Sequence, residues 1–230
     1  MSEILITKSN HLIQASYRLT LNEQRLVLTC IGQLDGRKPL PRDNMFTITA
    51  ADFSESFDVS IDKAYEYLKE AAENLYERTI TKIEGKVRDN QRWVYRAKYY
   101  EGEAKVELGF SPSVAPYLTM LHKKFTSYQL KRVAALRSVH SIRIFEMLSQ
   151  RKDTGKLIIR LDDFKDRLEL GDKYTRFYDI KRRVIDPAIK ELAAKSNLEI
   201  KLETKKEGRG VSTLIFDFKD VDQIPLDLSD

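Results

Sequence analysis

The chain has 230 residues, of which 42% are hydrophobic and 33% are charged, so it can form one large or two smaller folded domains. No segment approaches the roughly 20 consecutive apolar residues of a membrane-spanning helix, and the N-terminus lacks the pattern of a secretory signal. We therefore expect a soluble, cytoplasmic protein. The single cysteine, Cys30, excludes an internal disulfide bond and a cysteine-based zinc site, and indicates a core residue.

The positive charge is concentrated in one part of the chain. Residues 1–122 carry 16 basic and 17 acidic side chains, whereas residues 123–219 carry 24 basic and 14 acidic ones, a net charge of +10. Residues 220–230 carry four acidic side chains and no basic one. A localised positive field attracts polyanions, which makes nucleic acid the first partner to test. A solubilising surface explains the charge alone equally well.

Hydrophobic periodicity predicts that helices and strands alternate along the first half of the chain. Apolar side chains recur at helical spacing in some segments and at every second position in others. In chain order, the predicted elements are a core helix at 21–34, a strand at 46–48, a short helix that begins after Thr49, a longer helix that begins after Ser60, a polar loop at 85–92, and two strands at 93–99 and 106–110.

The second half repeats this order of elements. Its predicted elements are a helix at 139–151, a strand at 157–161, a short helix at 161–170, a long helix at 175–195, and two strands at 198–202 and 213–218 joined by a loop. Asp52 and Phe53 recur as Asp163 and Phe164, 111 residues later. The repeated order and the repeated residues indicate an internal duplication.

Each predicted unit ends in a β-hairpin after a long helix, which is the arrangement of a winged helix. The sequence therefore predicts an α+β fold with two tandem winged-helix domains. We expect an N-terminal domain at 1–122, a C-terminal domain at 123–219 and an acidic tail at 220–230. Because the major groove of DNA admits one helix, the long helix of each unit is the one expected to enter it.

The second long helix has an apolar face and a face rich in hydrogen-bonding groups. At 100° per residue, the side chains predicted to face inward are Phe177, Ile180, Val184 and Ala188. Pro187 should kink or restart the helix, and Lys181, nearer the buried side, should reach a phosphate. The glycine-flanked loop at 203–212 suits a phosphate or a narrow minor groove. The residues expected to bind DNA in this domain are Tyr174, Thr175, Arg176, Tyr178, Asp179, Lys181, Arg182, Arg183, Lys205, Lys206 and Arg209.

The first long helix is a poorer candidate for reading DNA, because its outward side chains include five acids that would repel phosphates. Only its first turn, with Ser60 and Lys63, is expected to touch DNA. Lys86, Arg88 and Arg92 are expected to be wing contacts. Packing or contact with another protein explains this helix equally well.

The sequence contains no catalytic motif that would indicate an enzyme. It has no His-x-His pair, no His-Glu-x-x-His motif and no glycine-rich ATP-binding loop. Residues His140 to Arg143 spell His-x-x-Arg, a fragment also found in tyrosine recombinases, but no further histidine follows. We interpret them as residues of a core helix, and we expect no enzymatic activity, no cofactor and no metal.

Three segments together resemble a known family. They are SNHLIQASYRLTLNEQRLVL at the front, FTSYQL followed by SVHSIRIFEML in the middle, and YTRFYDIKRRVIDPAIKELAAKSNLEI towards the end. This combination resembles the iteron-type plasmid replication initiators, proteins of theta-replicating bacterial plasmids that are built from two winged-helix domains. The resemblance runs from about Lys8 to Lys219.

The resemblance implies that monomers bind direct repeats, called iterons, at a plasmid origin and help to open an adjacent AT-rich duplex. It implies that dimers bind an inverted half-site and repress the initiator's own gene, with the first domain forming the dimer contact. It also implies that the second domain grips double-stranded DNA in both states and that the protein recruits the host helicase and the host initiator. Two alternatives remain open: a winged-helix transcriptional regulator without initiator activity, and a protein-interaction module with an acidic partner.

Overall fold

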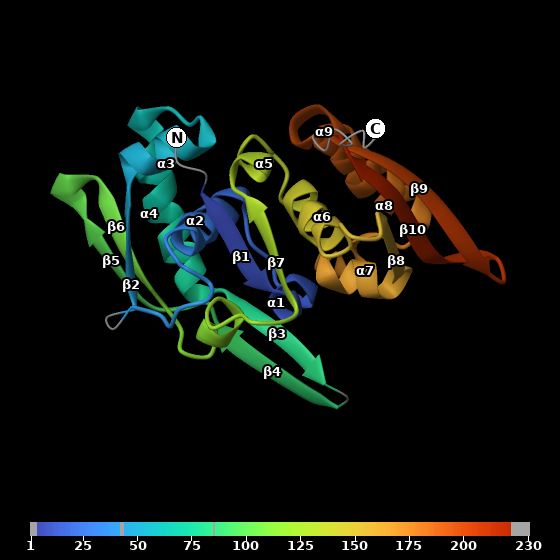
Figure 1. The fold of residues 1–230 in the computed structure, drawn as a ribbon, viewed down its shortest axis with the longest axis horizontal. Helices are drawn as coiled ribbons and strands as arrows, with labels where there is room; N and C mark the ends of the chain where they lie inside the picture. The colour runs from blue at the N-terminus through green and yellow to red at the C-terminus, as the bar shows by residue number, and fades with distance from the viewer. Residues whose placement is uncertain (1–3, 42–43, 85, 222–230) are drawn as a thin grey trace, which may run out of the picture.

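The computed structural model describes residues 4–41, 44–84 and 86–221. Figure 1 shows two units side by side, with the blue-to-green first unit on the left and the yellow-to-red second unit on the right. Nearly all buried apolar residues of both units belong to one hydrophobic cluster. Within the described ranges, no helix has the length and the apolar character needed to cross a membrane. Of the predicted acidic tail, only Asp220 and Val221 fall within the described residues.

The first unit contains the predicted helices and strands in the predicted order. Its elements are α2 (Leu21–Gly32), β2 (Met45–Thr49), α3 (Ala50–Phe57), α4 (Ile61–Glu77), β5 (Val94–Tyr100), the short 3-10 helix η1 (Glu101–Glu103) and β6 (Lys105–Phe110). A capping box between Thr20 and Glu23 begins α2, and the Thr49 side chain caps α3. The strands form an antiparallel sheet in the order β2-β6-β5.

The second unit has the same topology. Its elements are α6 (Val139–Ser149), β8 (Lys156–Arg160), α7 (Leu161–Arg167), η3 (Gly171–Lys173), α8 (Phe177–Ile180), the π-helical turn η4 (Lys181–Ile185), α9 (Asp186–Ser196), β9 (Leu198–Glu207) and β10 (Gly210–Asp220). Its sheet order, β8-β10-β9, again places the last strand between the first and the second. The chain therefore has an α+β fold of two tandem winged-helix units, as the sequence predicts.

The prediction of a polar loop at 85–92 is wrong, because residues 87–92 form a strand. An additional antiparallel hairpin, β3 (Thr79–Glu84) with β4 (Val87–Arg92), lies between α4 and β5. Ile80 is buried, but β4 is almost entirely exposed. A strand with neither face buried has no alternating apolar pattern, so periodicity could not reveal it.

The wing of the second unit is longer than the sequence predicts. Strands β9 and β10 continue through most of the segment predicted as a loop, and the turn lies at Glu207–Gly210. Gly208 adopts a φ of 60° in this turn, a left-handed conformation that glycine accepts without strain. Lys205 and Lys206 therefore lie on the strand, and Arg209 lies at the tip.

An N-terminal strand that the sequence analysis did not predict connects the two units. Strand β1 (Leu5–Ser9) pairs antiparallel with β7 (Phe125–Gln129), and both lie between the two units in Figure 1. The helix α1 (Asn10–Gln14) follows β1, whereas the short 3-10 helix η2 (Ala115–Tyr117) precedes β7 and α5 (Lys131–Ala134) follows it. Strand β1 thus pairs with a segment beyond the predicted domain boundary between residues 122 and 123. The boundary itself stays a prediction.

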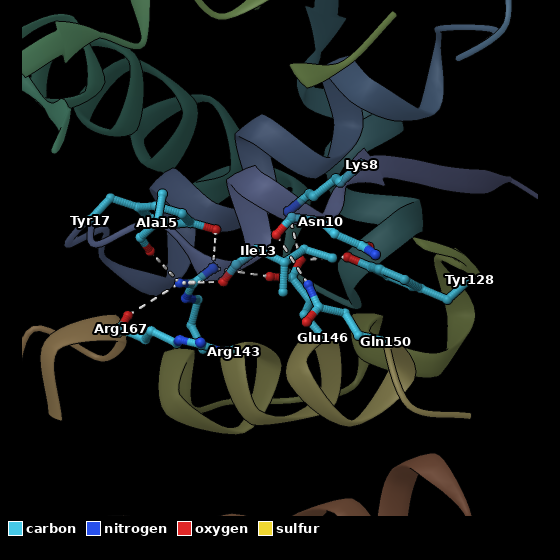
Figure 2. A network of polar contacts seen from close by, with 10 residues as sticks. All are labelled: Lys8, Asn10, Ile13, Ala15, Tyr17, Tyr128, Arg143, Glu146, Gln150 and Arg167. Carbon is cyan, nitrogen blue, oxygen red and sulfur yellow. Dashed lines mark hydrogen bonds and ion pairs between the residues drawn. The ribbon is translucent and has the colours of Figure 1, made fainter. Parts of the chain in front are cut away.

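A fully buried carboxylate fixes this connection, as Figure 2 shows. Glu146 on α6 accepts a bond of 2.6 Å from Lys8 Nζ of β1 at its Oε1 atom. The hydroxyl of Tyr128 on β7 donates to the same oxygen, also at 2.6 Å. Three elements that are distant in the sequence therefore meet at one charged group.

Arg143, one turn before Glu146 on α6, binds the segment that follows β1. Its guanidinium donates to the carbonyl oxygens of Ile13 at 3.0 Å and Ala15 at 2.9 Å, and to the hydroxyl of Tyr17. It also donates to the carbonyl of Arg167 at 3.1 Å. Arg143 is only 3% exposed, which confirms that the His-x-x-Arg fragment belongs to a core helix.

The charge of Glu146 is maintained by its neighbours. Burial alone would raise the pKa of this carboxyl, but the positive charges of Lys8 and Arg143 hold the pKa below its usual value of 4.5. A carboxyl with a lowered folded-state pKa stabilises the protein fully above the usual pKa, and this stability is lost as the pH falls through the folded-state value.

Replacing Glu146 with Gln should lower the free energy of unfolding by about 3–5 kcal/mol, because two buried cations lose their counter-charge. The difference from the wild type should shrink as the pH falls below about 4.5, where the carboxyl of the unfolded wild type takes up a proton, and vanish once the pH has fallen through the lower folded-state pKa. Urea unfolding at several pH values measures both effects. Glu203→Gln breaks an exposed pair with Lys201 and should cost under about 1 kcal/mol. Equal losses for the two variants would contradict this account.

Candidate nucleic-acid interface

The long helix of the second unit, from Phe177 to Ser196, packs through the face that the sequence predicts. Ile180, Val184 and Ala188 are buried, and Phe177 is half-buried. Ile185 is buried as well, although a regular helix would turn it away from this face. The helix therefore departs from regular α-geometry near residue 185.

A π-helical turn explains the burial of Ile185. The turn η4 covers Lys181–Ile185, and the N–H of Asp186 donates to the carbonyl of Lys181, five residues earlier. Pro187 follows directly and has no N–H to donate, so it interrupts the α-helical bonding pattern at this point. The extra residue in the turn rotates both Val184 and Ile185 toward the core. Pro187 thus changes the register of the helix, in partial agreement with the predicted kink.

The opposite face of this helix is open. The exposed fraction of Tyr178 is 64%, and Thr175, Arg176, Arg182 and Arg183 are also exposed. Within the described ranges, Arg182 and Arg183 have no carboxylate partner. Guanidinium groups that are free to donate can reach guanine or phosphate oxygens. This face can therefore bind a nucleic acid without first breaking an ion pair.

Three predicted contacts on this helix or just before it differ from the expectation. Tyr174 is only 8% exposed and belongs to the core, so it lies beneath the surface rather than on it. Asp179 is half-buried. Lys181 is exposed, but its ammonium lies 2.7 Å from Asp186 Oδ1, so an ion pair competes with the predicted phosphate contact. The burial of Tyr174 and Asp179 and the ion pair of Lys181 depend on three-dimensional packing, which the 100° helical periodicity does not describe.

The wing of the second unit is basic. Lys205, Lys206 and Arg209 are exposed, and none of them has a carboxylate partner among the described residues. Figure 1 shows the β9–β10 hairpin extending beyond the body of the unit. The three charges are therefore carried on a projecting element in the same unit as the open helix face, as predicted.

The wing of the first unit is acidic, in contrast. In this unit the hairpin equivalent to β9–β10 is β5–β6, and its tip carries Glu101 and Glu103. These carboxylates pair with Lys69 at 3.2 Å and with Lys105 at 2.6 Å. A carboxylate tip repels phosphate, so this wing is a poor DNA contact.

The basic residues predicted as wing contacts of the first unit lie on the additional hairpin instead. Lys86 and Arg88 are exposed there, on or beside β4. Arg92 is also exposed, but it pairs with Glu77 at 3.2 Å and donates to the carbonyl of Tyr76. The prediction of a wing position is therefore wrong, because β3–β4 precedes the true wing.

The remaining predicted contacts, Ser60 and Lys63, are exposed at the start of α4. Two further exposed cations were not among the predicted contacts: Arg96 on β5, and Lys173 just before the long helix of the second unit. Lys173 directly precedes Tyr174 in the sequence, so it could have been included among the predicted contacts. Among the described residues, no group of three or more histidine, cysteine or acidic side chains is arranged to hold a metal.

Comparison with known proteins identifies the family. A model described as "Initiator Replication protein, WH1" matches residues 5–149, and a second, "Initiator Rep protein, WH2", matches residues 160–218. The chain belongs to the initiator replication protein family. The first match contains the sheet β2-β6-β5 and extends through α6, and the second contains most of the β9–β10 hairpin of the other sheet.

Individual relatives agree with this assignment. The initiator is 33% identical over 225 residues to a replication initiation protein of Escherichia coli, covering 94% of this chain and 70% of the relative. It is 26% identical over 250 residues to the PI protein of Escherichia coli, covering 93% and 82%. A crystal structure of Pi initiator protein in complex with iteron DNA matches with a TM-score of 0.81 at 24% identity, covering 95% of this chain and 98% of that one. This structural likeness shows the shared fold.

Replacing Asp186 with Asn should tighten DNA binding several-fold at low salt, because Lys181 loses the ion pair that occupies it. Fluorescence anisotropy with a labelled duplex measures the change. Asp35→Asn releases Arg37 and Lys38 from a carboxylate in a loop of the first unit and serves as the matched control. An equal gain in both variants would show that only the net charge matters.

Proposed function

We propose that this protein initiates plasmid DNA replication by binding iterons, the direct repeats of the replication origin. The observation that carries the proposal is the open arginine face of the second long helix, in one unit with a basic wing. A helix in the major groove and a wing on the flanking backbone are the two contacts that a winged helix makes with duplex DNA. The family assignment and the likeness to Pi initiator protein, whose solved structure contains iteron DNA, support the proposal.

The charge distribution supports a division of labour between the two units. The second domain, proposed at 123–219, carries a net charge of +10 and is the main DNA-binding domain. The first, proposed at 1–122, carries an acidic wing tip and acids along α4, so it makes the secondary DNA contact and forms the dimer contact. In this proposal, monomers bind the direct repeats, and dimers bind an operator and repress the initiator's own gene. The protein acts in the bacterial cytoplasm and recruits the host helicase and initiator.

Footprinting on the DNA that flanks the gene tests the proposed function. Two winged helices on one face of a duplex read grooves about 10.5 bp apart, so one monomer should protect about 20 bp of each direct repeat. Protection of a single operator without repeats would favour a transcriptional regulator. No protection at all would favour a protein-interaction module.

The affinity for DNA should depend steeply on salt. If six to ten phosphates are neutralised, the affinity should fall by about 10³ to 10⁵ between 50 and 200 mM salt. Anisotropy titrations over this range measure the slope of log affinity against log salt concentration. An affinity that does not change with salt would rule out binding through the basic helix face and wing.

Replacing Arg182 with Ala should weaken binding by about 1–3 kcal/mol and reduce the preference for one base pair, because a side chain on the groove-facing surface is lost. Lys206→Ala, on the wing, should weaken binding to all sequences alike. Competition between an iteron duplex and single-base variants separates the two effects. Lys38→Ala, in a loop of the first unit, is the control and should leave binding unchanged.

A further inference from the structure

A cleft at the junction of the two units is lined by residues that no functional prediction includes. Its volume is about 580 Å³. The segment before α2 forms one wall, the segment before α8 forms another, and the first residues of α6 lie between them. Tyr17 and Arg143, both labelled in Figure 2, also line the cleft and are themselves buried.

Two exposed cations from different units line this cleft. Arg18 belongs to the segment before α2, and Lys173 belongs to the turn η3 just before α8. Within the described ranges, neither side chain has a carboxylate partner. His140, at the start of α6, also lines the cleft. Burial lowers the pKa of its imidazole, and the positive charges of Lys173 and Arg18 lower this pKa further. The two cations therefore line the same cleft.

The other cations of the cleft are already paired with carboxylates. Arg78 forms two bonds of 3.0 Å with Glu23, and Arg143 belongs to the buried cluster with Glu146. Glu169 is the acidic residue among those lining the cleft, and its carboxylate accepts a bond of 2.7 Å from the Ser16 hydroxyl. Because a hydroxyl leaves the charge of Glu169 in place, two unpaired cations face one carboxylate, and the cleft keeps an excess of positive charge.

We propose that Arg18 and Lys173 together bind one phosphate group of the DNA backbone in this cleft. The proposal rests on the proposed function, because it assigns the phosphate to the duplex that the two units read. Lys173 lies three residues before Arg176, at the start of the long helix whose outer face carries Arg182 and Arg183. A backbone that passes from one unit to the other must cross their junction, and this cleft lies at the junction. Paired cations on either side of a phosphate neutralise it and fix the protein's register on the duplex.

The double variant Arg18→Gln/Lys173→Gln tests the proposal. With one phosphate contact fewer, the slope of log affinity against log salt should decrease in magnitude by about 0.9, and iteron affinity should fall about tenfold. Arg37→Gln/Lys38→Gln removes the same charge from a loop of the first unit and should leave the slope unchanged. Both cleft residues are exposed, so thermal unfolding should confirm that the variant folds. A cleft variant that behaves like the control overturns the proposal.

Two further readouts identify the source of the phosphate and separate this proposal from the function. If the wild type protects direct repeats but the cleft variant binds them unchanged, the cleft assignment fails and the proposed function stands. If the wild type selects no repeat but binds any duplex, and the cleft variant alone has the smaller slope, the proposed function fails and the cleft assignment stands. Unchanged DNA binding together with lost binding of inorganic phosphate would assign the cleft to a free phosphate compound and overturn the DNA assignment.

Discussion

The buried contact between Lys8, Glu146 and Arg143 determines how the two units are placed relative to each other. It joins the N-terminal strand and the segment after it to the first helix of the second unit. A buried charge that loses its partner costs several kcal/mol, so the three groups hold one another in place. Since the first unit continues directly from this anchored segment, the positions of its helices relative to the second unit depend on the same contact. Two winged helices can read one duplex only if their spacing is defined.

This fixed junction gives the asymmetry of the molecule a physical meaning. The second unit has an arginine face and a basic wing without neutralising carboxylates among the described residues, whereas the wing tip of the first unit is acidic and ion-paired. The two units therefore share their topology but differ in surface chemistry. The cleft between the units adds positive charge where a backbone would cross from one unit to the other.

Sequence periodicity predicted those parts of the fold in which one face is buried. The inward face of the second long helix is an example, because Ile180 and Val184 repeat at helical spacing and are buried. The β3–β4 hairpin could not be predicted in this way, because β4 has no buried face, and the pairing of β1 with β7 joins segments about 120 residues apart. Local sequence likewise does not show that Lys181 pairs with Asp186, or that Arg18 and Lys173 line the same cleft.

Affinity cleavage from the second long helix tests the central claim most directly. Cys30 is buried, and burial raises the pKa of its thiol, so a Tyr178→Cys variant offers one reactive site for an iron chelate. If the long helix lies in the major groove, the chelate should cut iteron DNA at one major-groove position in every repeat. A bound protein that cuts no repeat from this position, but cuts DNA when the chelate is attached at an exposed residue of the first unit, would contradict the account.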